Sequence, residues 1–301
     1  MHLMNTYICT LLIGTTMLLS TTLHATTLEK SYFWEFEGKR YNLRYSFDAD
    51  DYKYYKQIKR DYNDFTVYMK ETPGRNVADD FALELNRMAR QYKLNQKETV
   101  EFVASFVQHF RYRDDGKYEY PRYPAETLVE QGGDCEDTAI LLAALLRSMG
   151  YETILLSPEG HMGVGLAVDG DLDGTGVEYQ GEKYYYIETT NTGWGIGDYP
   201  DHLSTAIRIL DPGSRVGCKP LALRAPGVKP SQANKDQATS SQASVGQHTA
   251  PQSGFQTDYT ANKELVADDR GVLSTDTMVI DGQKQETVTY QSSGRIAMSD
   301  H

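Results

Sequence analysis

The chain has 301 residues, of which 40% are hydrophobic and 24% charged, and its formal net charge is −12. A chain of this length can bury a core of ordinary size and carry additional segments. Because the charge is acidic and no basic patch stands out, we expect no nucleic-acid partner.

The N-terminal residues are typical of an export signal. Residues 8–20 form an apolar run that is too short to span a bilayer comfortably, and Ala25 offers a small residue for cleavage, although no Lys or Arg precedes the run. We therefore expect residues 1–25 to be a signal peptide and the protein to be exported, to the periplasm or outside the cell. No stable membrane span is expected once the signal is cleaved.

The next hundred residues predict a β-hairpin followed by helices. Period-two alternation on both sides of Gly38 predicts a hairpin over residues 32–47. Asn95 and Glu98 form a capping pair for the clearest helix. The predicted helices cover residues 50–60, 78–92, 95–110 and 125–131. The Tyr-rich connection before residue 125 is compatible with a substrate cleft and equally with core packing.

The run Gly132-Gly133-Asp134-Cys135 is the stretch around which the rest is organised. It predicts a tight turn and a capped helix start, with Asp134 as N-cap and Asp137 three residues on, followed by an apolar helix that ends at Gly150. Cys135 is then the first helical residue, where the helix dipole favours the thiolate, which is the nucleophilic form. The alternative is a small buried Cys on a core helix.

Two strands after this helix carry the other candidate residues. His161 opens a predicted strand over 161–168, and a predicted strand over 183–190 has Glu188 near its end. If these strands pair as antiparallel neighbours, the two side chains meet at one edge of the sheet. The small residues Gly163, Gly165 and Ala167 share a face with His161 and leave room for another group to approach.

A cysteine nucleophile needs a base and a group that orients the base. His161 is the best candidate base, because the other histidines lie in the signal, in the tail, on an apolar helix or beside a proline turn. Glu188 is the candidate orienting group and Asn191 is its substitute. An ordinary hairpin carboxylate is the alternative interpretation of Glu188.

The C-terminal third has the composition of a disordered tail. From about Lys219 the chain is rich in Ser, Gln, Ala and Pro, and only one hairpin, around Asp281-Gly282, is suggested. We therefore divide the chain into the signal at 1–25, a domain at 26–218 with a catalytic core at about 95–200, and a largely disordered tail at 219–301. Cys218 has no derived role, and a disulfide with Cys135 is the alternative in an oxidising compartment.

These motifs resemble the transglutaminase-like superfamily, and are most similar to the bacterial and archaeal transglutaminase-like cysteine proteinases. The resemblance rests on the Gly-Asp-Cys motif at 133–135, on His161 opening a strand and on the acidic residue that ends an aromatic strand, and it covers roughly Asn95 to Asp198. It implies an α+β papain-like fold with the nucleophile at a helix N-terminus packed on an antiparallel sheet. It also implies a Cys135, His161 and Glu188 triad, in which Glu stands where the family usually has Asp.

Such a triad attacks an amide carbonyl and forms a thioester. Water as acceptor gives a protease and an amine gives a transglutaminase; we favour hydrolysis of a protein or peptide substrate. The oxyanion donors are expected to be the Cys135 N–H and a side chain upstream, with Gln131 and Tyr123 as candidates. The alternative from another class is a non-catalytic peptide or cell-wall binding module on the same fold.

Carboxylates flank the nucleophile and oppose thiolate formation. Acids in a first helical turn are ordinary, but Asp134 and Glu136 also suit a hard cation such as Ca²⁺. Some proteinases that resemble this chain through the Asp-Cys-Glu run bind calcium there. We expect no cofactor to be required for the chemistry, and calcium to be a candidate ligand of Asp134 and Glu136.

Overall fold

The computed structural model describes residues 26–223 and three further strands at 262–268, 271–280 and 283–291. The predicted signal peptide lies outside the described residues. Within the described part of the chain, no helix is both long and apolar enough to cross a membrane.

The N-terminal hairpin is present and is longer than predicted. Strand β1 (Thr27–Phe36) pairs antiparallel with β2 (Lys39–Asp48), and the turn is made by Glu37 and Gly38, both with positive φ. Positive φ at both central residues is the turn that matches the twist of a two-residue hairpin. Alternate residues of β1 are buried in the core, among them Tyr32 and Trp34.

The helical part follows the hairpin. Helix α3 begins with the predicted capping box, in which Glu98 N–H donates to Asn95 Oδ1 (3.0 Å) and Asn95 N–H donates to Glu98 Oε2 (2.7 Å). A short 3-10 helix, η1, was not predicted, because it has no apolar periodicity of its own. The elements are α1 (Ala49–Gln57), η1 (Phe65–Met69), α2 (Val77–Gln91), α3 (Gln96–Gln108), α4 (Pro124–Glu130) and α5 (Cys135–Ser148).

A mixed sheet forms the second layer. Its strand order is β7-β8-β6-β5-β9, all antiparallel, and β10 adds to β6 in parallel. The acidic segment 169–182 contains strand β7 of this sheet. The strands are β5 (Thr153–Pro158), β6 (Gly163–Asp169), β7 (Gly176–Tyr179), β8 (Glu182–Ile187), β9 (Ile207–Leu210) and β10 (Leu221–Ala222).

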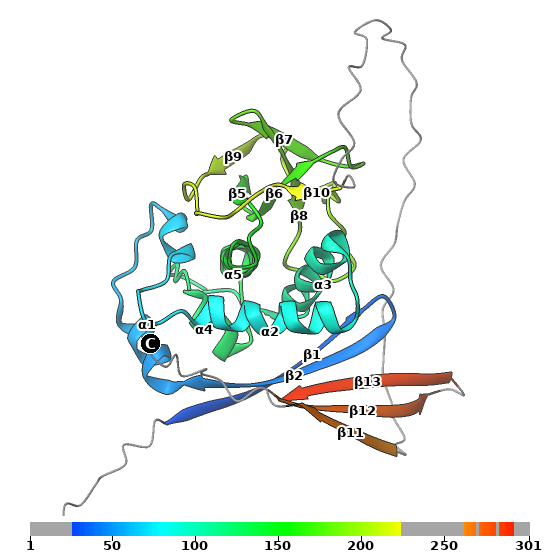
Figure 1. The fold of residues 1–301 in the computed structure, drawn as a ribbon. Helices are drawn as coiled ribbons and strands as arrows, with labels where there is room; N and C mark the ends of the chain where they lie inside the picture. The colour runs from blue at the N-terminus through cyan, green and yellow to red at the C-terminus, as the bar shows by residue number, and fades with distance from the viewer. Residues whose placement is uncertain (1–25, 224–261, 269–270, 281–282, 292–301) are drawn as a thin grey trace, which may run out of the picture.

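Helix α5 is the centre of the fold. It lies between the β5–β6–β8 sheet and helices α2, α3 and α4, with the β1–β2 hairpin beyond those helices (Figure 1). Its residues from Ala139 to Leu146 are all at most 2% exposed. A helix that is apolar on every side must be covered on every side, and this one is. The predicted α+β architecture, with the cysteine helix packed on a sheet, is confirmed.

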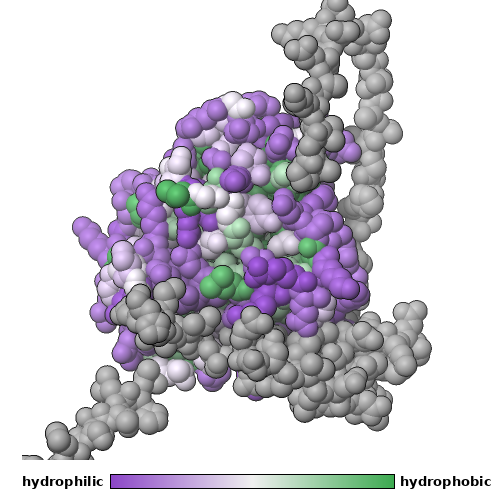
Figure 2. Space-filling view, in the orientation of Figure 1, coloured by the Kyte–Doolittle hydropathy of each residue, from purple (hydrophilic) through white to green (hydrophobic). Residues whose placement is uncertain are grey.

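The surface is largely polar. On the face drawn in Figure 2, hydrophilic residues predominate and the hydrophobic patches are separate from one another. Scattered apolar residues of this kind are normal for a protein surface.

The predicted domain boundary at residue 218 is too early. Lys219 O accepts from Glu152 N–H (3.0 Å), and Leu221 is fully buried and pairs with Val168. Composition marked this segment as tail, but a single leucine that completes the core holds it in place. The packed domain therefore includes residues up to Leu223.

Part of the predicted tail also forms strands. β12 (Gly271–Ile280) and β13 (Gln283–Gln291) make the hairpin suggested around Asp281-Gly282, and β11 (Asn262–Asp268) extends it. Contrary to expectation the hairpin is not isolated, because β13 pairs in parallel with β2. The physical reason is that β2 has one edge left open by β1, and an open edge accepts another strand.

Candidate active site

Two glycines place Cys135 at the start of α5. Gly132 and Gly133 form β4, which pairs in parallel with β3 (Arg111–Tyr112). A Cβ on Gly132 would lie 2.5 Å from Arg111 O, and one on Gly133 would lie 2.4 Å from the Asp137 side chain. Only glycine permits this approach. Asp134 N–H then donates to Asp137 Oδ2 (3.4 Å), and the helix begins at Cys135, as predicted.

His161 lies in the turn before β6, two residues before that strand begins. Its N–H donates to Pro158 O (3.1 Å), which closes the turn. Glu188 directly follows the last residue of β8. The predicted antiparallel pairing of these strands is present, with Val164 opposite Ile187, and it brings both side chains to one edge.

The two side chains are hydrogen bonded. His161 Nε2 lies 2.9 Å from Glu188 Oε2, and Glu188 is 2% exposed. Asn191, the substitute candidate, is exposed and its side chain accepts from Thr192 N–H. The bond through Nε2 leaves His161 Nδ1 as the ring nitrogen available for another group.

Glu188 is held ionised by its surroundings. Burial opposes ionisation, but hydrogen bonds from His161 and Thr190 outweigh it and lower the pKa of Glu188 to about 2. Glu188 Oε1 accepts from the N–H groups of Thr189 (2.9 Å) and Thr190 (2.8 Å), and Tyr186 Oη donates to Oε2 (3.1 Å). Such a carboxylate is fixed in place.

This shift predicts a measurable dependence of stability on acid. Because the folded pKa lies below the usual value of 4.5, the stabilisation is complete above about pH 4.5 and is lost as the pH falls toward 2. The stabilisation that is lost over this pH range is roughly 3 kcal/mol. We expect the free energy of unfolding of Glu188→Gln to fall less between pH 5 and pH 2.5 than that of the wild type, measured by denaturant titration. Glu182→Gln, at an exposed position of the same strand, is the control; equal acid slopes in the wild type and Glu188→Gln would contradict the prediction.

Cys135 lies beside the same edge. Among the groups that act on its thiol is the backbone N–H of Met162, the residue after His161, which lowers the pKa of Cys135. Thr138 Oγ1 of α5 lies 2.9 Å from Thr189 Oγ1, next to Glu188. The structure therefore joins His161 to Glu188 by a hydrogen bond and places the first turn of α5, which begins at Cys135, against the end of β8.

The thiol does not have the low pKa that the helix start predicts. Burial, and then the carboxylates of Glu136 and Asp134, raise the pKa of Cys135, against the opposing effect of the Met162 N–H. Cys135 Sγ donates to Glu136 Oε2 (3.2 Å). In this arrangement burial and the local negative charge outweigh the helix dipole.

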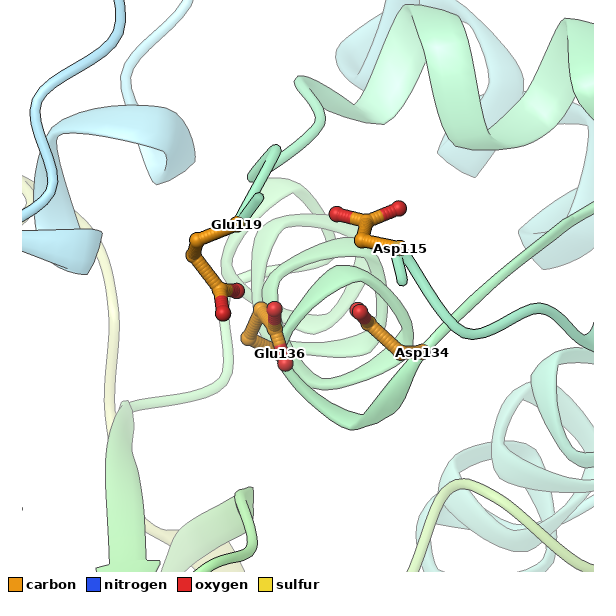
Figure 3. Close-up of side chains that lie close together, drawn as sticks. All are labelled: Asp115, Glu119, Asp134 and Glu136. Carbon is orange, nitrogen blue, oxygen red and sulfur yellow. The ribbon is translucent and has the colours of Figure 1, made fainter. Parts of the chain in front are cut away.

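Four carboxylates converge beside the nucleophile (Figure 3). Asp134 and Glu136 at the start of α5 face Asp115 and Glu119 from the preceding loop, with one oxygen of each residue within 4.8 Å of the others. Asp134 Oδ1 and Glu136 Oε1 are buried and accept no hydrogen bond. Burial, Glu119 and Asp134 raise the pKa of Glu136 to about 10. Asp134 and Glu136 were predicted from the sequence. Asp115 and Glu119 were not, because they meet the other two only through the fold.

The space beside His161 is filled by the protein itself. A Cβ on Gly163 would lie 2.5 Å from the Tyr186 ring, so the small-residue face that we expected to admit another group admits Tyr186. Gln108 Nε2 donates to Glu188 O and to Trp194 O, both at 2.9 Å, and so fixes the strand end. Neither supporting residue carries a sequence signal, since each acts through its position.

The two candidate oxyanion side chains have other contacts. Gln131 Nε2 donates to Ser31 O (2.6 Å), and the Tyr123 ring packs on Tyr55 and Tyr68. Cys218 is a free thiol near Arg147 O at the far end of α5. A helix of this length extends about 20 Å, so a disulfide between Cys218 and Cys135 is excluded.

Residues 84–157 match the model of the Transglutaminase-like superfamily. The match covers 74 of the 301 residues. The match includes the Gly-Asp-Cys motif and ends four residues before His161, so it begins and ends earlier than the resemblance that we described.

No curated protein matches the chain. Among solved structures, calcium-bound LapG of Legionella pneumophila is similar with 17% identity, over 41% of this chain and 80% of that one, with a TM-score of 0.26. The transglutaminase-like match supports an enzyme-like fold at the family level.

Proposed function

We propose that this protein is an exported thiol hydrolase that cleaves peptide amides through Cys135, His161 and Glu188. The observation that carries the proposal is the 2.9 Å bond between His161 Nε2 and Glu188 Oε2, at the end of β8 that contacts the first turn of α5, where Cys135 lies. A buried carboxylate that fixes one imidazole nitrogen leaves the other to exchange a proton with the thiol. Export is proposed from the apolar run at 8–20 alone.

The proposed reaction has two stages. His161 Nδ1 takes the proton of Cys135 while the sulfur attacks the amide carbonyl, and the imidazolium then gives that proton to the departing amine. Water, deprotonated by His161, then attacks the thioester, the C–S bond breaks to release the acid, and the imidazolium returns the proton to the departing Cys135 sulfur. Glu188 remains ionised and stabilises the imidazolium in both stages. The Cys135 N–H at the helix start is the proposed oxyanion donor.

The molecule that attacks the thioester, water or an amine, distinguishes this proposal from its alternatives. Full-length protein is incubated with a library of peptides, with and without a primary amine, and the products are identified by mass spectrometry. Hydrolysis predicts free acids in both samples and a burst of thioester in each. Amide products in the amine sample would support transglutaminase chemistry. Peptide capture with no cleavage and no modification by a thiol reagent would support a binding module instead.

We further propose that the four-carboxylate cluster holds Ca²⁺. Asp115, Glu119, Asp134 and Glu136 offer a convergent set of hard oxygen donors, which suits calcium. The two buried oxygens that accept no hydrogen bond are the observation that separates this cluster from an ordinary solvated acidic surface. When bound, the ion would neutralise the charges that oppose thiolate formation at Cys135. It would also fix the loop that carries Asp115 and Glu119 to α5.

Calcium is therefore expected to stabilise the fold. A ligand at one hundred times its Kd adds about 2.7 kcal/mol, so we expect Ca²⁺ to raise the Tm of the chelator-treated protein by several degrees. Glu119→Gln, at an exposed position of the cluster, should reduce that increase. Glu178→Gln, at an exposed position of β7, should leave it unchanged. If Ca²⁺ does not change the Tm of the wild type, the calcium proposal is wrong, and Asp134 and Glu136 serve only the start of α5.

A further inference from the structure

A cavity lies in the N-terminal half of the fold, and its wall includes Gln131, which is close in the chain to Cys135. It has a volume of about 360 Å³ and lies between the edge strand β1 and the connection from α3 to β3. Its polar lining includes Ser31, His109, Arg111, Arg113 and Gln131. It is distinct from the carboxylate cluster, with which it shares no residue.

The charge of this cavity is opposite to that of the chain. No Asp or Glu lines it, although the chain has 42 acidic residues against 30 Lys and Arg. Arg111 and Arg113 are exposed, and within residues 26–223 neither guanidinium has an ion pair or a hydrogen bond. Arg60 and Arg122, by contrast, are paired with buried carboxylates. Two unpaired guanidinium groups in one concave site are ready to bind carboxylates in forked geometry.

The cavity is close to the nucleophile along the chain. Arg111 pairs with Gly132, and Gln131 in the cavity wall is four residues from Cys135. Four extended residues span at most about 14 Å. An extended peptide that is cleaved at Cys135 therefore reaches the wall of the cavity at Gln131 within about four residues of the bond that breaks.

The edge of β1 does not accept a peptide as an added strand here. Ser31 O already accepts from Gln131 Nε2 (2.6 Å), and Glu35 N–H donates to His109 Nε2 (3.2 Å). Because these backbone groups are already bonded to side chains, recognition in the cavity depends on the arginines. We infer that this cavity is a specificity subsite for acidic side chains of an extended peptide substrate, bound by Arg111 and Arg113.

This inference depends on the proposed function only in that the bound peptide is also cleaved. Binding itself can be measured without catalysis. The probe is a fluorescein-labelled peptide of alternating Gly and Glu, and its control replaces Glu with Lys. Anisotropy is measured with the full-length wild type, with Arg111→Gln/Arg113→Gln and with Arg208→Gln. Arg208 is an exposed arginine on β9 that does not line the cavity.

We expect the Glu probe to bind the wild type and Arg208→Gln equally, and more tightly at low salt. The double variant should lose at least about tenfold in affinity, since two charge-assisted contacts are removed. The Lys probe should not bind. Equal affinity of wild type and double variant, no preference for Glu over Lys, or no binding of the Glu probe would each overturn the inference. A Tm equal to that of the wild type shows that the double variant is folded.

The same proteins separate this inference from the proposed function. If the Glu probe binds through the arginines but no thiol-dependent cleavage occurs, the subsite stands and the proposed hydrolysis fails. If peptides are cleaved but flanking Glu residues do not lower KM in the wild type relative to the double variant, the hydrolysis stands and the subsite fails.

Discussion

The Cys135→Ala variant is expected to lose amide hydrolysis by at least about 10³-fold in kcat/KM, because the residual activity of such sites comes from binding and the oxyanion donors alone. The fold should persist, since Cys135 is at the first position of α5 and only partly buried. The measurement is cleavage of a peptide found in the library screen, with Tm recorded for the same preparation. Cys218→Ala, which changes a free thiol at the other end of α5, is the matched control and should retain full activity.

His161→Ala should be about as severe as Cys135→Ala, because members of such a triad act as a unit and their losses do not add. His202→Ala, which changes an exposed histidine, should leave kcat/KM unchanged. If Cys135→Ala retains activity, Cys135 is not the nucleophile. Loss of activity in His202→Ala with retention in His161→Ala would move the base to another residue.

The Arg122→Met variant is expected to lose about 3–5 kcal/mol of stability, the usual cost of leaving a buried charge without its partner. The Arg122 side chain is 12% exposed and pairs with the fully buried Asp137 and with Asp115 (2.8 Å). Burial lowers the pKa of Arg122, but Asp137 and Asp115 outweigh it and hold the guanidinium charged. Since Asp137 accepts the Asp134 N–H at the start of α5, activity should fall together with stability.

The control for Arg122 is Arg215→Met. Arg215 pairs with Asp79, but the two side chains are 39% and 36% exposed, and such pairs contribute at most about 1 kcal/mol. Denaturant titration of the two variants measures the difference directly. A loss for Arg122→Met no larger than that for Arg215→Met would show that Asp137 is satisfied by the Arg122 backbone N–H alone.

The elements that the sequence predicted well are those with strong local signals. The hairpin turn at Gly38, the capping box of α3 and the apolar run of α5 each depend on residues close together in the chain. The meeting of His161 and Glu188 was also predictable, because antiparallel pairing of two adjacent strands fixes their ends at one edge.

What the sequence could not predict depends on long-range contacts. Asp115 and Glu119 join Asp134 and Glu136 only because the loop before α4 folds back over the start of α5. Leu221 completes the core from within a segment that composition marks as tail. For the pKa of Cys135 the sequence offered two opposing local effects, the helix dipole and the flanking carboxylates; burial, the largest cause of its rise, is set by the whole fold.

The bond between Thr138 and Thr189 joins two segments that are 51 residues apart in the chain. The ribosome makes the nucleophile first, and the histidine and the glutamate follow 26 and 53 residues later. A nascent or partly unfolded chain thus carries a thiol with neither a base nor a fixed carboxylate beside it. The proposed hydrolase activity would therefore begin only when the sheet docks on α5, and the fold itself would protect neighbouring chains from premature cleavage during synthesis.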